Sequence, residues 1–184
     1  IVHSPNEEGL YAPNLTYAEM TFGQGTSLTM VQVASAFSGI INGGYMVSPT
    51  MIKGVMKDGK LVANQYDGKD DYQVISSDTS ATMRQMLHEA RSLYLKKDNP
   101  GYYLGGKSGT GQVYLEDLGR YSEPDGETTA TYIGFGGVEG ELPKYVIMVK
   151  IWGSGANADA NDSKSVFDEL SDMMIDYLKI KPRI

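Results

Sequence analysis

The sequence predicts an α+β fold in which helices pack on an antiparallel sheet. Two segments of the first half, 29–41 and 77–97, carry apolar residues at helical spacing. The second half contains three strand candidates, 102–114, 128–135 and 145–152, with hairpin composition at 136–143 between the last two. A further helical pattern covers 163–179 and stops before Pro182. Runs of helix and runs of strand that do not alternate are typical of this class.

The helix at 29–41 has the clearest boundaries. Thr29-Met30-Val31-Gln32 has the form of a capping box, in which the Thr hydroxyl and the Gln amide each satisfy a free backbone N–H group. Asn42-Gly43-Gly44 supplies a left-handed stop. For the second helix we expect Ser77 or Asp78 as the cap. Its predicted inward residues are Met83, Met86, Leu87, Ala90 and either Leu93 or Tyr94.

The remaining segments predict simpler structure. Residues 1–22 are rich in turn formers and predict an irregular lead-in, with room for one short strand and no functional site. Asp58-Gly59 lies between two short apolar stretches and predicts a two-residue hairpin turn. We expect residues 1–184 to be part of a single domain, with the helices and the sheet in 23–184.

Composition excludes several classes of function. The 16 Lys and Arg against 23 Asp and Glu give a net charge of −7, which argues against nucleic acid or an anionic membrane surface as the main partner. Cysteine is absent, and only His3 and His88 are present, so thiol chemistry and multi-histidine metal sites are excluded. We expect no metal and no cofactor, a surface or partly buried His88, and a packing role for Trp152. No apolar run approaches the roughly 20 residues of a membrane span.

The most informative segment is 105–112, Gly-Gly-Lys-Ser-Gly-Thr-Gly-Gln. Its glycines let a ligand approach the backbone, and its lysine and hydroxyls suit a carboxylate or a phosphate. One interpretation is a phosphate loop, because 101–108 matches G-x-x-x-x-G-K-[ST]. That motif needs a strand before it and a helix after it. Asn99-Pro100 upstream and the strand-like continuation downstream disfavour this nucleotide-binding interpretation.

The other interpretation is a resemblance to a known family. Lys107-Ser108-Gly109-Thr110-Gly111-Gln112 resembles the third motif of the penicillin-binding and β-lactamase-type serine acyl transferases. Phe22-Gly23-Gln24-Gly25, followed by the helix and Asn42-Gly43-Gly44, is similar to a second signature of the class B, monofunctional penicillin-binding proteins. The order of the segments 132–135, 145–150 and 166–182 also follows that family. The resemblance covers nearly all of the chain from about residue 20 onward.

The resemblance implies a serine D,D-transpeptidase that cross-links peptidoglycan, with stem peptides as substrates and β-lactams as ligands. Lys107 would hold its ammonium near the substrate carboxylate and the proton-transfer network. Ser108 and Thr110 would offer hydroxyls, and Thr110 would also give its backbone N–H to the oxyanion hole. Gly109 would let the substrate pair with the strand edge. Gln112 would support the strand geometry.

The chain departs from the family pattern at the nucleophile. No serine is followed by lysine three residues later, as Ser-x-x-Lys requires; Ser92 comes nearest, with Lys96 four residues away. Ser4-Pro5-Asn6 matches the second motif, Ser-x-Asn, in letters, but its turn-rich context marks it as a coincidence. We therefore expect the C-terminal portion of a transpeptidase domain, inactive alone. The alternative is a non-catalytic binding or scaffold module of the wall-synthesis complex.

The same resemblance implies where the longer protein works. We expect it at the outer face of the bacterial cytoplasmic membrane, anchored by an upstream segment, with other cell-wall synthesis or division proteins as partners and no nucleic acid. The ending and the Gly-Lys-Ser-Gly-Thr context favour the division type over the elongation type. A sheet separated from helices of the upstream half would expose apolar surface, so we also expect self-association of this chain.

Overall fold

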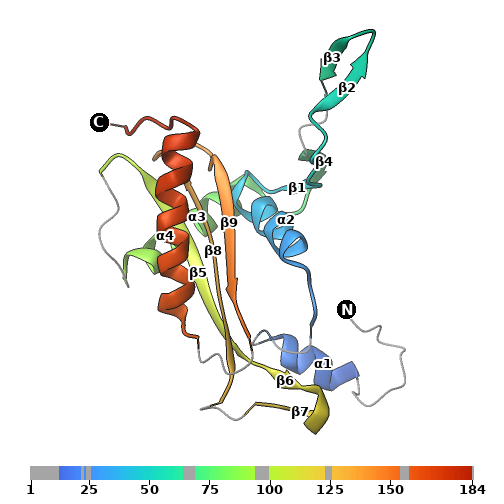
Figure 1. Cartoon of the computed structure of the whole chain (residues 1–184). Helices are drawn as coiled ribbons and strands as arrows, with labels where there is room; N and C mark the ends of the chain where they lie inside the picture. Colours follow the sequence, from blue (N-terminus) through green and yellow to red (C-terminus); the bar gives the residue numbers. More distant parts are fainter. Residues whose placement is uncertain are drawn as a thin grey trace.

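A three-stranded antiparallel sheet forms the centre of the computed structural model, which describes residues 13–21, 23, 26–63, 69–93, 100–122, 126–153 and 158–183. Its strands are β5 (Tyr103–Gln112), β8 (Thr128–Gly137) and β9 (Tyr145–Ile151), in the order β5-β8-β9. Helix α4 (Ala160–Tyr177) packs on one face, and α2 (Met30–Ile41) and α3 (Ser77–Ser92) pack on the other (Figure 1). The predicted α+β class is confirmed.

The alternating side chains of β8 supply the core on both faces. Phe135 is fully buried among Phe37 and Ile41 of α2 and Leu87 of α3. On the opposite face Tyr132 packs with Val149 of β9 and Phe167 of α4, with 4.8 Å between the centroids of the Tyr132 and Phe167 rings. The sheet is therefore held between two separate apolar clusters.

The capping chemistry of α2 and α4 agrees with local sequence. Thr29 and Gln32 form both hydrogen bonds of the predicted capping box at the start of α2. Helix α4 begins at Ala160, three residues before the predicted start, because Asp159 caps it and Asp162 completes a second capping box. The acidic residues before the apolar pattern were the signal for this earlier start.

Helix α3 departs from the predicted pattern at its cap and on its inward face. Ser76, not Ser77 or Asp78, is the N-cap and accepts a hydrogen bond from the Thr79 N–H. Met86 is 57% exposed, so its predicted burial is wrong; of the alternatives Leu93 and Tyr94, Leu93 is 79% exposed and does not point inward. Leu87 is buried as predicted, but the other buried residues of α3 are polar: Ser80 and Arg91. Tyr94 and residues 95–97 lie outside the part of the chain that the structure describes.

Helix α1 (Pro13–Met20) replaces the predicted irregular lead-in at residues 13–20. Pro13 contributed to that prediction as a turn former, yet it occupies the first helical position, where its missing N–H removes no helical hydrogen bond. Residues 1–12, which include Ser4-Pro5-Asn6, lie outside the described part, as do Phe22, Gln24 and Gly25 of the second signature.

A hairpin extends away from the body of the molecule (Figure 1). It consists of β2 (Gly54–Lys57) and β3 (Lys60–Ala63), and the two turn residues, Asp58 and Gly59, have φ of 51° and 75°. The predicted Asp-Gly turn is thus confirmed. At its base β1 (Tyr45–Val47) pairs with β4 (Lys69–Gln73). We call residues 51–63 the arm.

A small ribbon continues from β5. Strand β6 (Tyr114–Leu115) and strand β7 (Arg120–Tyr121) pair across the short helix η1 (Glu116–Leu118). None of the helices in the described ranges combines the length and apolar character needed to cross a membrane.

Candidate functional site

Strand β5 carries the predicted motif, and it changes character along its length. Residues 104–106 are buried, whereas Lys107, Gly109 and Thr110 are exposed and Ser108 is half-buried. Within the described sheet β5 pairs only with β8, so its other edge is unpaired. The motif therefore lies on an edge strand, as the resemblance implies.

The phosphate-loop interpretation is wrong. Gly105 to Gln112 run within one ten-residue strand, with each residue in register with β8 from Tyr103↔Gly137 to Gln112↔Thr128. No helix begins directly after Lys107 and Ser108, because the chain continues as β5 to Gln112, so this segment does not provide the helix N-terminus that binds phosphate in that motif.

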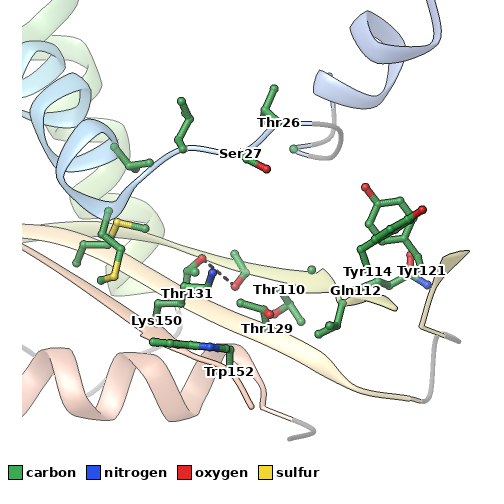
Figure 2. A pocket seen from close by; sticks show the side chains of 18 of the residues that line it. Thr26, Ser27, Thr110, Gln112, Tyr114, Tyr121, Thr129, Thr131, Lys150 and Trp152 are labelled. Carbon is green, nitrogen blue, oxygen red and sulfur yellow. Dashed lines mark hydrogen bonds between the residues drawn. The ribbon is translucent and has the colours of Figure 1, made fainter. Parts of the chain in front are cut away.

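An open groove of about 850 Å³ lies beside the second half of β5 (Figure 2). Its floor is the exposed part of the sheet, and its far wall is formed by the segment before α2 and by α1. Predicted site residues Gly109, Thr110 and Gln112 line the groove, whereas Lys107 and Ser108 lie just before its end on the same strand. The remaining polar and aromatic lining includes Thr26, Ser27, Tyr114, Tyr121, Lys150 and Trp152.

Three hydrogen bonds fix the polar groups of this strand. Lys107 Nζ donates to Ser108 O at 2.8 Å, so its ammonium is held close to the strand. Thr131 Oγ1 of β8 donates to Gly109 O at 3.2 Å. Gln112 Nε2 donates to Ser122 O at 2.6 Å, which connects the end of β5 to the residue after β7.

The sequence-based prediction missed the second and third strands of the groove floor. Thr129 and Thr131 of β8 and Lys150 of β9 line the groove, because residues two apart on a strand share a face. Trp152 also lines it and is 66% exposed, so its predicted packing role is wrong. The Lys150 ammonium lies 5.4 Å from the centroid of the Trp152 ring, within the range of a cation–π contact. A predicted strand order and register for the three strand candidates would have placed these residues beside the motif.

Glycines allow the buried half of β5 to lie very close to its neighbours. A Cβ atom on Gly105 would come within 2.5 Å of the Phe135 ring, and one on Gly106 within 2.6 Å of the Tyr132 ring. A Cβ atom on Gly109 would meet only the Thr131 hydroxyl, at 2.8 Å. Gly105 and Gly106 thus allow close packing against aromatic rings, and Gly109 leaves space at the groove.

The chemistry of the described groove is hydroxyl-rich with few charges. Its charged lining residues are Glu19 and Lys150, and Lys107 adds a cation at the end of the groove. Within the described ranges no cluster of three or more His, Cys, Asp or Glu has the arrangement of a metal site. An edge strand with unpaired backbone groups, flanked by hydroxyls and an ammonium, suits an extended peptide that ends in a carboxylate.

Comparisons with known proteins identify the family of this chain. A family model described as the penicillin binding protein transpeptidase domain matches residues 4–172. Penicillin-binding protein PbpB of Mycobacterium tuberculosis is 30% identical over 159 residues, which are 78% of this chain and 22% of that protein. The probable peptidoglycan D,D-transpeptidase FtsI of Caulobacter vibrioides is 32% identical over 116 residues, 58% of this chain and 18% of that protein.

Solved structures show the same likeness. The crystal structure of penicillin binding protein 3 from M. tuberculosis, complexed with aztreonam, is 25% identical and has a TM-score of 0.72. The match covers 95% of this chain and 40% of that one; the ampicillin complex gives a TM-score of 0.73. The chain spans about a fifth of the length of the curated relatives it matches. As the ordered motifs predict, this chain belongs to the penicillin-binding protein transpeptidase domain family.

Proposed function

We propose that this chain supplies the substrate-binding strand of a serine D,D-transpeptidase that cross-links peptidoglycan and binds penicillin. The observation that carries the proposal is the Lys107-Ser108-Gly109-Thr110 segment on an unpaired strand edge beside a groove. The names of the relatives, a D,D-transpeptidase and penicillin-binding proteins, support the same reaction class.

Each residue has a defined role in this proposal. The Lys107 ammonium attracts the free carboxylate of a D-Ala-D-Ala peptide or of a β-lactam, and Ser108 and Thr110 donate hydroxyl hydrogen bonds to it. The Thr110 N–H stabilises the oxyanion that forms when a serine attacks the peptide carbonyl, a contribution of about 3 kcal/mol per donor. Gly109 leaves room for the peptide along the strand edge, and Gln112 holds the strand end through Ser122.

The nucleophile comes from outside residues 1–184 in this proposal, because Ser-x-x-Lys is absent from them. That serine attacks the carbonyl of the penultimate residue; the C–N bond to the last D-Ala breaks, and the released amine takes the proton. The acyl group then passes to an acceptor amine. The 184 residues alone contain no Ser-x-x-Lys motif to supply the attacking serine, so we expect them not to be acylated.

A fluorescent penicillin tests the proposal. The longer natural protein should become covalently labelled, and the label should be lost when the serine of its Ser-x-x-Lys motif is replaced by alanine. The isolated 184-residue chain should remain unlabelled. If the longer protein is folded, as judged by circular dichroism, but is not labelled, the proposed activity is ruled out.

The absence of Ser-x-x-Lys also supports a second candidate, a non-catalytic binding or scaffold module of the wall-synthesis complex. A gene in which no Ser-x-x-Lys precedes Ile1 favours this candidate over the enzyme. In either case we propose an extracytoplasmic location, with an upstream membrane anchor and division or wall-synthesis proteins as partners, because the relatives are peptidoglycan and penicillin-binding proteins by name.

A further inference from the structure

The buried half of β5 is attached to α3 through His88. His88 Nδ1 lies 2.6 Å from Leu104 O, and because a carbonyl oxygen only accepts, Nδ1 carries the proton in this contact. The His88 ring also stacks on Tyr103, with 4.2 Å between ring centroids. Burial raises the pKa of the Tyr103 phenol. His88 thus contacts β5 three residues before Lys107.

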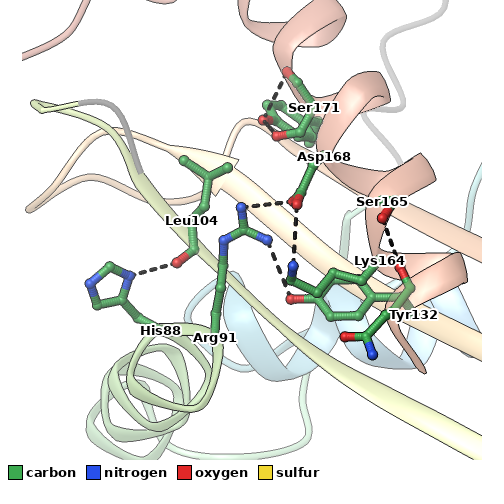
Figure 3. Close-up of polar contacts among 10 residues, drawn as sticks. His88, Arg91, Leu104, Tyr132, Lys164, Ser165, Asp168 and Ser171 are labelled. Carbon is green, nitrogen blue, oxygen red and sulfur yellow. Dashed lines mark hydrogen bonds and ion pairs between the residues drawn. The ribbon is translucent and has the colours of Figure 1, made fainter. Parts of the chain in front are cut away.

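One turn further along α3, Arg91 extends past β5 to the helix on the other face of the sheet (Figure 3). Its Nη2 forms an ion pair with Asp168 Oδ1 of α4 at 2.8 Å, and its Nη1 lies 3.5 Å from the Tyr132 hydroxyl of β8. The guanidinium also lies 5.3 Å from the centroid of the Phe167 ring. Arg91 is 6% exposed, whereas the Asp168 side chain is 34% exposed, so the guanidinium is buried and the carboxylate is partly open to solvent.

Tyr132 brings the contacts of Arg91 and Asp168 next to β5. The ring and hydroxyl of Tyr132 lie within 2.7 Å of the position that a Cβ atom on Gly106 would take, so Arg91 reaches Tyr132 beside the residue that immediately precedes Lys107. Asp168 is also 3.5 Å from Lys164 Nζ of its own helix, which helps to hold the carboxylate in place. Elements from both faces of the sheet therefore meet at one point of the edge strand.

We propose that Arg91 and Asp168 are positioning residues for the motif: their ion pair fixes β5 between α3 and α4 and so sets where Lys107, Ser108 and Thr110 stand relative to bound substrate. This inference rests on the proposed function for its effect on acylation. The reaction rate of an enzyme depends strongly on such positioning, because a displacement of a positioning group by about 1 Å can lower the rate roughly 100-fold. An edge strand needs this support because it has a neighbouring strand on one side only.

Hydrogen–deuterium exchange on the longer natural protein tests the positioning directly. Arg91→Gln and Asp168→Asn should speed exchange across 107–112, whereas the matched variant Arg84→Gln should not. Arg84 is a partly buried arginine of the same helix, but it donates to Ile41 O of α2 and to Ser80, not to β8 or α4. Unchanged exchange over 107–112 in Arg91→Gln would overturn the inference, whether or not the protein is acylated.

Acylation kinetics with a β-lactam test the functional consequence in the same protein. Arg91→Gln should lower the acylation rate constant roughly tenfold or more, a larger change than in the dissociation constant of the noncovalent complex. Arg84→Gln should have little effect at a temperature where both variants remain folded. An equal loss in the two variants would show a general stability effect and would contradict the positioning role.

Two substitutions at Arg91 separate positioning from packing and also cover a variant that fails to fold. Arg91→Lys keeps a charge for Asp168, whereas Arg91→Met keeps apolar contact with Phe167 and removes every donor. Positioning by the ion pair predicts that Arg91→Lys retains more acylation than Arg91→Met, and the reverse order would overturn it. If the wild-type protein were not acylated at all, the proposed function would fail, while the exchange measurement would still decide the role of the ion pair.

Discussion

Lys107 is the first residue of β5 beyond the buried half of the strand, and its ammonium lies 2.8 Å from Ser108 O. This contact keeps the cation next to the backbone that would pair with a peptide. A substrate carboxylate arriving along the strand would replace a carbonyl partner with a charged one. Hydrogen bonds to charged groups are stronger than those to neutral groups, so replacing the Ser108 carbonyl by the substrate carboxylate as the partner of Lys107 favours the bound state.

Replacing Lys107 by methionine tests that role. Lys107→Met keeps most of the side-chain length but removes the charge, and we expect acylation of the longer protein to fall roughly 10- to 150-fold, the range for losing about 1.5–3 kcal/mol. Because Lys107 is exposed, the melting temperature should change little. Lys144→Met is the control, since Lys144 pairs with Glu141 on the surface outside the groove. Equal acylation in the two variants would contradict the assignment.

Gly105 and Gly109 of β5 should respond differently to replacement by alanine. Gly105→Ala should destabilise the chain by about 1–3 kcal/mol, because the new methyl group would overlap the buried Phe135 ring. Gly109→Ala should cost less, because only the Thr131 hydroxyl must move, yet it should weaken β-lactam capture by narrowing the strand edge. Urea unfolding of the chain measures the first effect, and penicillin labelling of the longer protein measures the second. Similar unfolding midpoints for both variants would refute this division of roles.

At the scale of elements, α4 depends on its N-cap. The Asp159 carboxylate accepts hydrogen bonds from the N–H groups of Asn161 and Asp162, at 2.6 and 3.2 Å. Asp159→Ala should cost about 1 kcal/mol and lower the melting temperature of the chain by roughly 2–4 °C. Asp176→Ala, near the C-terminal end of the same helix, removes a charge that the helix dipole disfavours and should not lower it. A lower melting temperature for Asp176→Ala would argue against the dipole and capping account.

The elements also show which parts of the fold can be predicted from sequence. Local chemistry was sufficient for the capping box at Thr29, for the Asp58-Gly59 turn and for the course of β5 through its glycines. It was not sufficient for α3, whose inward face carries Ser80 and Arg91. Those polar side chains are buried because partners from other elements satisfy them, and no periodicity within 77–97 encodes those partners. The strand that carries the β5 motif was predicted, but the rest of the groove floor required the pairing of β8 and β9.

At the scale of the whole molecule, charge and apolar surface are unevenly divided. The arm contains Lys53, Lys57, Lys60 and Asp58, which sum to 3 − 1 = +2, so the remaining residues carry −7 − 2 = −9. The arm is also the site of six exposed apolar side chains: Met51, Ile52, Val55, Met56, Leu61 and Val62. Because the arm and the body have opposite charge, the net charge of −7 does not oppose contact between the arm of one copy and the body of another.

We therefore expect the isolated chain to self-associate through the arm. A two-stranded hairpin is only marginally stable by itself, and its exposed strand edges can pair with another chain. Met56 and Leu61 lie directly opposite one another, so the double variant Met56→Thr, Leu61→Thr removes apolar surface while a Thr–Thr pair preserves the hairpin. Sedimentation velocity should show a concentration-dependent shift for the wild-type chain and a smaller shift for this variant.

Met173→Gln is the matched control for the arm, because Met173 is comparably exposed, 65% against 64% for Met56, but lies on α4. It removes one apolar side chain outside the arm and should leave the shift unchanged. Added salt should weaken the association as well, because screening reduces the attraction between the +2 arm and the acidic body. A monodisperse wild-type chain would contradict self-association, and an equal effect of Met173→Gln would place the contact elsewhere than on the arm.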